Sequence, residues 1–268
     1  MHDQVSDVQV SDKTFRVFDN KLEATPIVFL HSNSGCWQHW QSQIDHFHQD
    51  YRVVAFGQIG CGESSPLSSD YTMMRQFEDT KALLKELGIN RCHIVGLSMG
   101  GACAQLFGLH SEQALSLCLA GIFRYDEMHP AVTKRYQDLA AMAKENPDPG
   151  RDFFANMPFG QDFIASSPDQ VDEILSGFFK TDYMAAAVLA TPESLAEIGQ
   201  EPVSEIDVPC LVVAGDEDTM APLVAVRELH DALPNSKWCL IEHTGHMMNI
   251  EKPEEFNETL SSFYHGLS

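Results

Sequence analysis

The sequence is poor in basic residues, and it contains no long apolar run and no closely spaced cysteine pair. Lys and Arg number 17 against 39 Asp and Glu in 268 residues, which gives a formal net charge of −22 at pH 7. An excess of acid on this scale repels phosphate backbones and anionic lipid, and no local cluster of Lys and Arg reverses it. We therefore expect a small-molecule substrate as the partner, with no nucleic acid and no membrane, and the oligomeric state stays open.

Two further absences narrow the class of protein. The longest apolar stretch, residues 184–190, is far shorter than the roughly 18 residues that a membrane span requires. The first residues contain neither a basic segment nor an apolar one, so we expect no secretory signal and a cytoplasmic location. The seven cysteines are widely spaced and form no C-x-x-C pair, which indicates reduced, mostly buried thiols and neither a disulfide framework nor a zinc site.

Short β-rich apolar runs alternate along the chain with longer segments of helical periodicity. The runs are apolar on both faces, as strands of a sheet covered by helices on both faces must be. The pattern predicts an α/β fold with a mostly parallel central sheet. Helices are expected to end at Gly88, where glycine suits a left-handed C-cap, and to begin at Pro222 and Pro253. The expected strands are residues 14–18, 26–30, 52–56, 93–97, 115–120, 210–214 and 238–241.

The strand signal disappears from residue 125 to residue 202, where prolines gather and short helical patterns remain. We predict a core formed by residues 1–124 and 203–268, with residues 125–202 inserted between two strands as a helical cap. Helices are expected near residues 131–144 and 169–179. The aromatic side chains of this segment are candidates for an apolar substrate pocket, although packing alone explains any single one of them equally well. Those considered for setting substrate chain length are Phe153, Phe159 and Phe178.

The residues Gly96-Leu97-Ser98-Met99-Gly100 stand directly after an expected strand and before a run of small residues. This is a G-x-S-x-G motif in a strand, turn and helix setting. A serine on such a sharp, strained turn projects above the sheet, and the flanking glycines let the helix pack closely against the strand. Ser98 is therefore a candidate nucleophile.

Two polar segments follow the last two expected strands. Asp218 lies in the first, four residues before the helix that begins at Pro222, and His246 lies in the second. The order Ser98, Asp218, His246 is that of α/β hydrolases and differs from the orders in chymotrypsin and subtilisin. Asp216 and Glu217 stay open as alternative acids, although the spacing to the proline favours Asp218.

Other polar patterns are weaker. His243 precedes the candidate histidine by three residues, but an H-x-x-H pair without a second ligand cluster does not make a metal site. The glycines at 57, 60 and 62 lack the Lys and the helix register of a phosphate loop. We therefore expect no metal and no cofactor.

Taken together, these motifs resemble the α/β-hydrolase superfamily over nearly the whole chain, in the branch with a small helical cap. Besides the serine motif, the matching segments are residues 31–35 after a strand, Gly215-x-x-Asp218-x-x-x-Pro222, and His246-x4-Glu251-x-Pro253. The resemblance implies a nucleophilic serine, a histidine acting as general base and then acid, and a carboxylate that orients the histidine.

Residue by residue, the resemblance assigns these roles to Ser98, His246 and Asp218, and it assigns the oxyanion hole to the backbone N–H groups of Asn33 and Met99. Two segments depart from the family. The usual His-Gly is His-Ser at residues 31–32, and the usual Asp-x-Arg-Gly-x-Gly-x-Ser has Gly and Ile in place of the Asp and the Arg at residues 57–64. The second departure predicts weaker support for that loop.

The expected activity is that of a serine hydrolase that cleaves a small, neutral, partly apolar carboxylic ester or lactone through an acyl-enzyme on Ser98. Residues 31–34 are similar to the corresponding loop of acyl-homoserine lactonases of this fold. A carbon-carbon bond hydrolase of the meta-cleavage type is the alternative, but those enzymes commonly carry Trp where this chain has Met247, together with cationic residues. Two further alternatives would use the same Ser, Asp and His residues. One is a slow-turnover receptor for a small ligand, and the other is a perhydrolase side activity.

Overall fold

The computed structural model of the chain describes residues 4–68, 70–134, 158–178, 194 and 197–267. Its centre is an eight-stranded sheet with the order β1-β2-β4-β3-β5-β6-β7-β8. Six neighbouring strands, β4, β3, β5, β6, β7 and β8, run parallel to one another. Strand β2 pairs antiparallel with both β1 and β4. The strands are β1 (Val5–Val10), β2 (Lys13–Asp19), β3 (Pro26–Leu30), β4 (Arg52–Phe56), β5 (Cys92–Leu97), β6 (Ala114–Ala120), β7 (Cys210–Gly215) and β8 (Ser236–Ile241).

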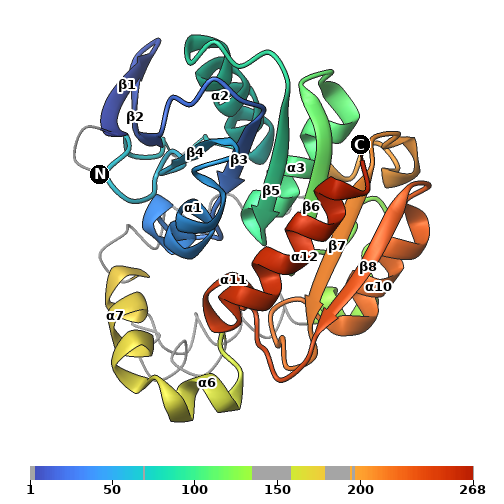
Figure 1. Ribbon diagram of the computed structural model, residues 1–268. Coiled ribbons are helices and arrows are strands. Elements are labelled where there is room, and N and C mark those ends of the chain that lie inside the picture. The colour runs from blue at the N-terminus through green and yellow to red at the C-terminus, as the bar shows by residue number, and fades with distance from the viewer. Residues whose placement is uncertain (1–3, 69, 135–157, 179–193, 195–196, 268) are drawn as a thin grey trace.

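Each face of this sheet carries a layer of helices (Figure 1). Helices α2, α3 and α10 pack on one face, and α1 and α12 pack on the other. The α/β fold with a mostly parallel central sheet and helices on both faces, expected from the sequence, is confirmed. The helices are α1 (Gln41–Phe47), α2 (Met73–Glu86), α3 (Met99–His110), α6 (Gln161–Ser166), α7 (Pro168–Phe178), α10 (Leu223–Ala232), α11 (Met248–Glu251) and α12 (Pro253–His265), with short 3-10 turns η2 (Trp37–Trp40) and η3 (Val203–Glu205).

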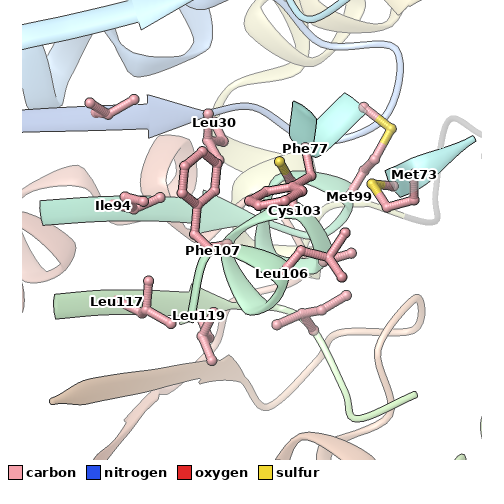
Figure 2. Packing of buried hydrophobic residues seen from close by; sticks show 14 of the residues in the cluster. Leu30, Met73, Phe77, Ile94, Met99, Cys103, Leu106, Phe107, Leu117 and Leu119 are labelled. Carbon is pink, nitrogen blue, oxygen red and sulfur yellow. The ribbon is translucent and has the colours of Figure 1, made fainter. Parts of the chain in front are cut away.

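The buried strands divide their side chains between the two layers. In β3, Val28 and Leu30 belong to the apolar cluster under α2 and α3, whereas Ile27 and Phe29 belong to the cluster under α1 and α12. In the first cluster, Phe77 of α2 meets Phe107 of α3 edge to face, with ring centroids 4.9 Å apart (Figure 2). Burying each such side chain contributes roughly 1.5–3 kcal/mol, so α3 is held firmly against the middle of the sheet.

All seven expected strands are present, with ends within two residues of those expected. The first strand, β1, was not expected, because Ser6, Asp7 and Gln9 interrupt its apolar pattern. It is an edge strand whose valines alone pack on the core, and it joins β2 through a two-residue turn in which Ser11 has a φ of 54°. Polar, exposed edge strands give little signal, because only one of their faces is buried.

The expected helix boundaries agree with the structure. Gly88 has a φ of +71° just after α2, Pro222 is the N-cap of α10, and Pro253 is the first residue of α12. All seven cysteines lie in the described part of the chain, and each is a free thiol. Among the described helices, none has the length and apolar character needed to cross a bilayer.

The segment between β6 and β7 is described only in part. Helix α7 matches the helix expected near residues 169–179, and residues 131–134 are helical, while the rest of the helix expected at 131–144 lies outside the described residues. Figure 1 shows α6 and α7, in yellow, beyond the carboxyl ends of the parallel strands, at the same end of the molecule as α11. The division into a core and a cap at residues 125–202 stays a prediction.

Candidate active site

Ser98 lies between β5 and α3 in a strained backbone conformation. Its φ is 55° and its ψ is −116°, a region that non-glycine residues rarely occupy. Its N–H donates to the carbonyl of Ala120 at 2.9 Å. A Cβ on Gly96 would lie 2.2 Å from the carbonyl oxygen of Gly100, and a Cβ on Gly100 would lie 2.1 Å from that of Leu30. Backbone contacts that only glycine permits therefore fix the position of the serine.

His246 and Asp218 form a buried pair at the ends of β8 and β7. Nδ1 of the histidine lies 2.8 Å from Oδ2 of the aspartate, and the two residues are only 5% and 8% exposed. The other carboxylate oxygen, Oδ1, accepts the N–H groups of Met220 and Ala221 at 2.7 and 2.9 Å. An ionised carboxylate can only accept, so Nδ1 carries the proton and Nε2 is the basic nitrogen of the neutral ring.

A glycine at the end of β6 connects this pair with the serine. A Cβ on Gly121, which has a φ of +54°, would lie 3.1 Å from Cε1 and Nδ1 of His246 and 3.3 Å from Oδ2 of Asp218. The preceding residue, Ala120, is the one whose carbonyl accepts the N–H of Ser98. Ala120 therefore contacts the serine, and the next residue, Gly121, contacts the histidine. Sequence reasoning missed Gly121, and a glycine directly after a buried strand was the only available signal.

The two alternative acids are engaged elsewhere. Asp216 is exposed, and its carboxylate accepts the N–H of Thr244 at 3.2 Å. Glu217 accepts the N–H of Gln161 at 2.7 Å. The carboxylate that contacts the histidine is that of Asp218, so the geometry favours it as the orienting acid.

His243 lies apart from the pair. It is exposed, with a φ of 54°, and its Nδ1 is 4.0 Å from a carboxylate oxygen of Glu217. Within the described ranges, no group of three or more His, Cys, Asp and Glu side chains is arranged to hold a metal ion.

The two residues expected to form the oxyanion hole lie at the same edge of the sheet as the serine. Met99 is the first residue of α3, where backbone N–H groups point outward at the positive end of the helix dipole. Asn33 belongs to the loop after β3. The close contact of Gly100 with the carbonyl of Leu30 holds the start of α3 against the end of that strand. In the same loop, the hydroxyl of Ser32 donates to the sulfur of Met247 at 3.7 Å. The loop therefore lies beside the histidine segment, and the role of the two N–H groups stays a prediction.

His31 ties this loop to the next one. Burial lowers the pKa of His31 to about 4, so the ring is neutral at pH 7. Its Nδ1 donates to the carbonyl of Ser32 at 2.6 Å, and its Nε2 accepts the N–H of Gln58 at 2.9 Å. The side-chain amide of Gln58 donates in turn to the carbonyl of His31 at 2.7 Å. A neutral histidine can do both, which fits the direction of its pKa shift.

The loop at residues 57–64 has more support than the sequence predicts. The hydroxyl of Ser64 donates to the carbonyl of Gly57 at 2.6 Å and accepts the N–H of Arg16 at 3.0 Å. A Cβ on Gly57 would lie 2.9 Å from that hydroxyl and from the carbonyl oxygen of Cys61. Hydrogen bonds of Ser64, the serine that this pattern retains, therefore hold the loop although the Asp and the Arg are missing.

Residues 158–160, which directly precede α6, pack on the histidine segment. The N–H groups of His246 and Met247 both donate to the carbonyl of Pro158, at 2.8 and 3.1 Å. Phe159 is 2% exposed, and its ring stacks on Phe163 with centroids 5.4 Å apart. Of the other two aromatic candidates, Phe153 lies outside the described residues and Phe178 is the last residue of α7.

The model of a family described as the α/β-hydrolase fold matches residues 25–253. The chain belongs to this family. It is 25% identical over 269 residues to proline iminopeptidase of Lactobacillus acidophilus, covering 90% of each chain. It is 28% identical over 249 residues to RutD of Pseudomonas syringae pv. syringae, named as a carbamate hydrolase, covering 90% of this chain and 94% of that protein.

Among solved structures, the chain is similar to Est816, described as an N-acyl homoserine lactone degrading enzyme. The TM-score is 0.83 at 24% identity, and the match covers 96% of this chain and all of that one. This likeness concerns the fold. The family and the names of the curated relatives identify the chain as an α/β hydrolase, and the bond it cleaves is a separate question.

Proposed function

We propose that this α/β hydrolase cleaves a small, neutral, partly apolar carboxylic ester or lactone through an acyl-enzyme on Ser98. The observation that carries the proposal is the buried His246–Asp218 pair, held at 2.8 Å beside the strained turn of the serine. Nucleophile, base and orienting carboxylate are the three groups that acyl transfer by a serine requires.

In the proposed reaction, Oγ of Ser98 attacks the carbonyl carbon while Nε2 of His246 takes the hydroxyl proton. The negative charge on the tetrahedral intermediate is accepted by the N–H groups of Met99 and Asn33, each contributing on the order of 3 kcal/mol. As the bond to the leaving alkoxide breaks, the imidazolium returns the proton to it. A water molecule then repeats the sequence on the acyl-enzyme, and Asp218 stays ionised throughout.

The charges around the histidine support a neutral substrate. Besides Asp218, the carboxylates of Asp216, Glu217 and Glu251 all bind backbone N–H groups of this region. Together with a net charge of −22, they disfavour a dianionic substrate of the carbon-carbon cleaving type. The iminopeptidase relative, which acts on an amide, is the reason to include an amide among the substrates tested.

The test is steady-state hydrolysis of p-nitrophenyl esters of increasing acyl length, a lactone panel followed by acid release, and a prolyl p-nitroanilide, each with Ser98→Ala as the control. We expect esters or lactones to give the highest kcat/KM, and the variant to lose turnover by about 10⁴-fold or more while keeping its circular dichroism. Activity that persists in Ser98→Ala would refute the serine mechanism. Cleavage of the amide alone would overturn the substrate class, and tight binding without turnover would point to a receptor or a carbon-carbon hydrolase.

A further inference from the structure

Glu251 is a buried carboxylate four residues after His246. It is 7% exposed and is the last residue of α11. Its Oε1 accepts the N–H of Met247 at 3.0 Å, and its Oε2 accepts the N–H of Gly245 at 3.0 Å. One carboxylate therefore binds the backbone on both sides of the histidine, which fixes the direction in which the histidine side chain leaves the chain.

The same carboxylate reaches a distant segment of the chain. Oε2 of Glu251 also accepts the N–H of Gly160 at 2.7 Å, the shortest of its three hydrogen bonds. A Cβ on Gly245 would lie 2.6 Å from the nitrogen of Gly160 and from the carbonyl carbon of Phe159, so the two backbones are in direct contact. If residues 158–160 moved away from residues 245–247, the bond from Gly160 to Glu251 would be lost. The two bonds that the carbonyl of Pro158 accepts from His246 and Met247 would be lost as well.

We propose that Glu251 is a positioning residue for His246, and that it acts by clamping residues 158–160 onto residues 245–247. The alignment of the histidine then depends on the docking of the segment between β6 and β7. This inference rests on the proposed role of His246 as the catalytic base. Within the described part of the chain, the hydrogen-bond partners of Glu251 are backbone N–H groups, so it acts through the histidine and not on the substrate.

The chemistry of the clamp explains why a charged group stands at a buried position. Burial and the nearby charge of Asp218 raise the pKa of Glu251, while the N–H groups of residues 160, 245 and 247 act in the opposite direction. Hydrogen bonds to an ionised acceptor are shorter and stronger than those to a neutral one. A glutamine offers one acceptor oxygen, and its amide N–H would face one of the three donors. Among side chains of this length, the carboxylate can accept hydrogen bonds with both of its terminal oxygens.

Glu217 provides a matched control. Its Oε2 accepts the N–H of Gln161 at 2.7 Å, one residue along from Gly160, and its other oxygen lies 4.0 Å from the exposed His243. It therefore anchors the same segment without a side-chain bond to residues 245–247. If both glutamates only dock this segment on the core, their substitution should lower kcat equally. If Glu251 also positions His246, its substitution should lower kcat more than that of Glu217.

The experiment compares Glu251→Gln with Glu217→Gln in the full-length protein. With the p-nitrophenyl ester that the wild type turns over best, we expect Glu251→Gln to lower kcat by about 100-fold, because small misplacement of a reacting group has effects of this size. KM should change little. Glu217→Gln should lower kcat by no more than about threefold. The far-downfield proton resonance of the His246–Asp218 hydrogen bond should broaden or shift in Glu251→Gln and stay in place in Glu217→Gln.

A second variant removes the clamp from its other end. Gly160→Pro deletes the N–H that donates to the carboxylate and is compatible with the φ of −71°, and its Cβ, 3.1 Å from the nitrogen of Gly245, also pushes this segment away from residues 245–247. It should lower kcat in the same way, so the proposal stays testable if Glu251→Gln does not fold. Wild-type kcat in Glu251→Gln, or equal losses in both glutamate variants, would overturn it. If the wild type hydrolyses no substrate, the proposed function fails, and the proton resonance still decides whether Glu251 positions the histidine.

Discussion

The two halves of the candidate site are held in place by different kinds of contact. On the serine side, the contacts are between backbones, and the glycines at 96 and 100 approach neighbouring carbonyls so closely that a methyl group would lie within 2.2 Å of them. On the histidine side, the carboxylates of Asp218 and Glu251 together accept five backbone N–H groups in addition to the imidazole. The serine is fixed by steric exclusion and the histidine by charge.

This difference predicts different responses to substitution. Steric exclusion is insensitive to pH, and it fails only when the backbone itself moves. A hydrogen bond to a charged group contributes roughly 1.5–3 kcal/mol, and it weakens when either partner loses its charge or its geometry. The serine side should therefore respond to changes in volume, and the histidine side to changes in charge.

The largest expected effect is that of Asp218→Asn on turnover. An asparagine would present an amide N–H to Nδ1 of His246, which would leave the proton on the wrong nitrogen, and kcat/KM should fall by about 10⁴-fold. The measurement is kcat/KM on the best ester or lactone, with Ser98→Ala defining the background.

Asp216→Asn is the matched control, because among the described residues this exposed carboxylate accepts one backbone N–H, that of Thr244, and makes no hydrogen bond to the imidazole. It should lower kcat/KM by no more than about threefold, as expected for an exposed polar contact. If Asp216→Asn were the more damaging of the two, the assignment of the acid would move, and the histidine side would not be organised as described.

A smaller effect, on stability, is expected for Gly100→Ala on the serine side. Its Cβ would lie 2.1 Å from the carbonyl oxygen of Leu30, so α3 must shift away from β3. Overpacking of this kind costs about 3 kcal/mol. Gly88→Ala is the control, because this glycine has a φ of +71° and open space around it, and the left-handed conformation alone costs about 1–2 kcal/mol.

Denaturant unfolding of the two alanine variants measures this difference directly. Gly100→Ala should lose both stability and turnover, whereas Gly88→Ala should lose stability alone. Equal stability losses would mean that the contact between α3 and β3 is not tight, and that the serine is held in some other way.

The same distinction explains what the sequence could and could not reveal. The serine side was visible because its glycines stand next to Ser98 in the chain, within a single pentapeptide. The pairing of Asp218 with His246 was visible because both follow strands and match a known order. The contact of Glu251 with Gly160 could not be seen in the sequence, because the two residues lie 91 positions apart and Gly160 contributes a backbone N–H. A backbone group leaves no mark in the sequence. Gly121 was missed because the side chains that it faces, those of Asp218 and His246, lie far away along the chain.

The smallest expected effect is a pH dependence of stability to which two buried groups of the site region, His31 and Glu251, contribute in opposite directions. His31 has a pKa of about 4 in the folded protein against an ordinary value of 6.5. Between these values the unfolded chain binds more protons than the folded one, so the free energy of unfolding falls as the pH is lowered. From pH 6.5 to pH 5.5 the loss should be about 1 kcal/mol. His39 and His93, whose pKa values burial also lowers, act in the same direction.

Glu251 acts in the opposite direction. Its pKa is raised by folding, so the folded state binds the proton more readily than the unfolded chain, and acidification through this group adds stability. Denaturant midpoints at pH 6.5, 5.5 and 4.5 should therefore show a shallower loss in His31→Gln than in the wild type, and a steeper loss in Glu251→Gln. Parallel curves for all three proteins would show that neither group is coupled to folding. A shallower curve for Glu251→Gln would mean that folding lowers the pKa of Glu251, so that its charged form stabilises the fold.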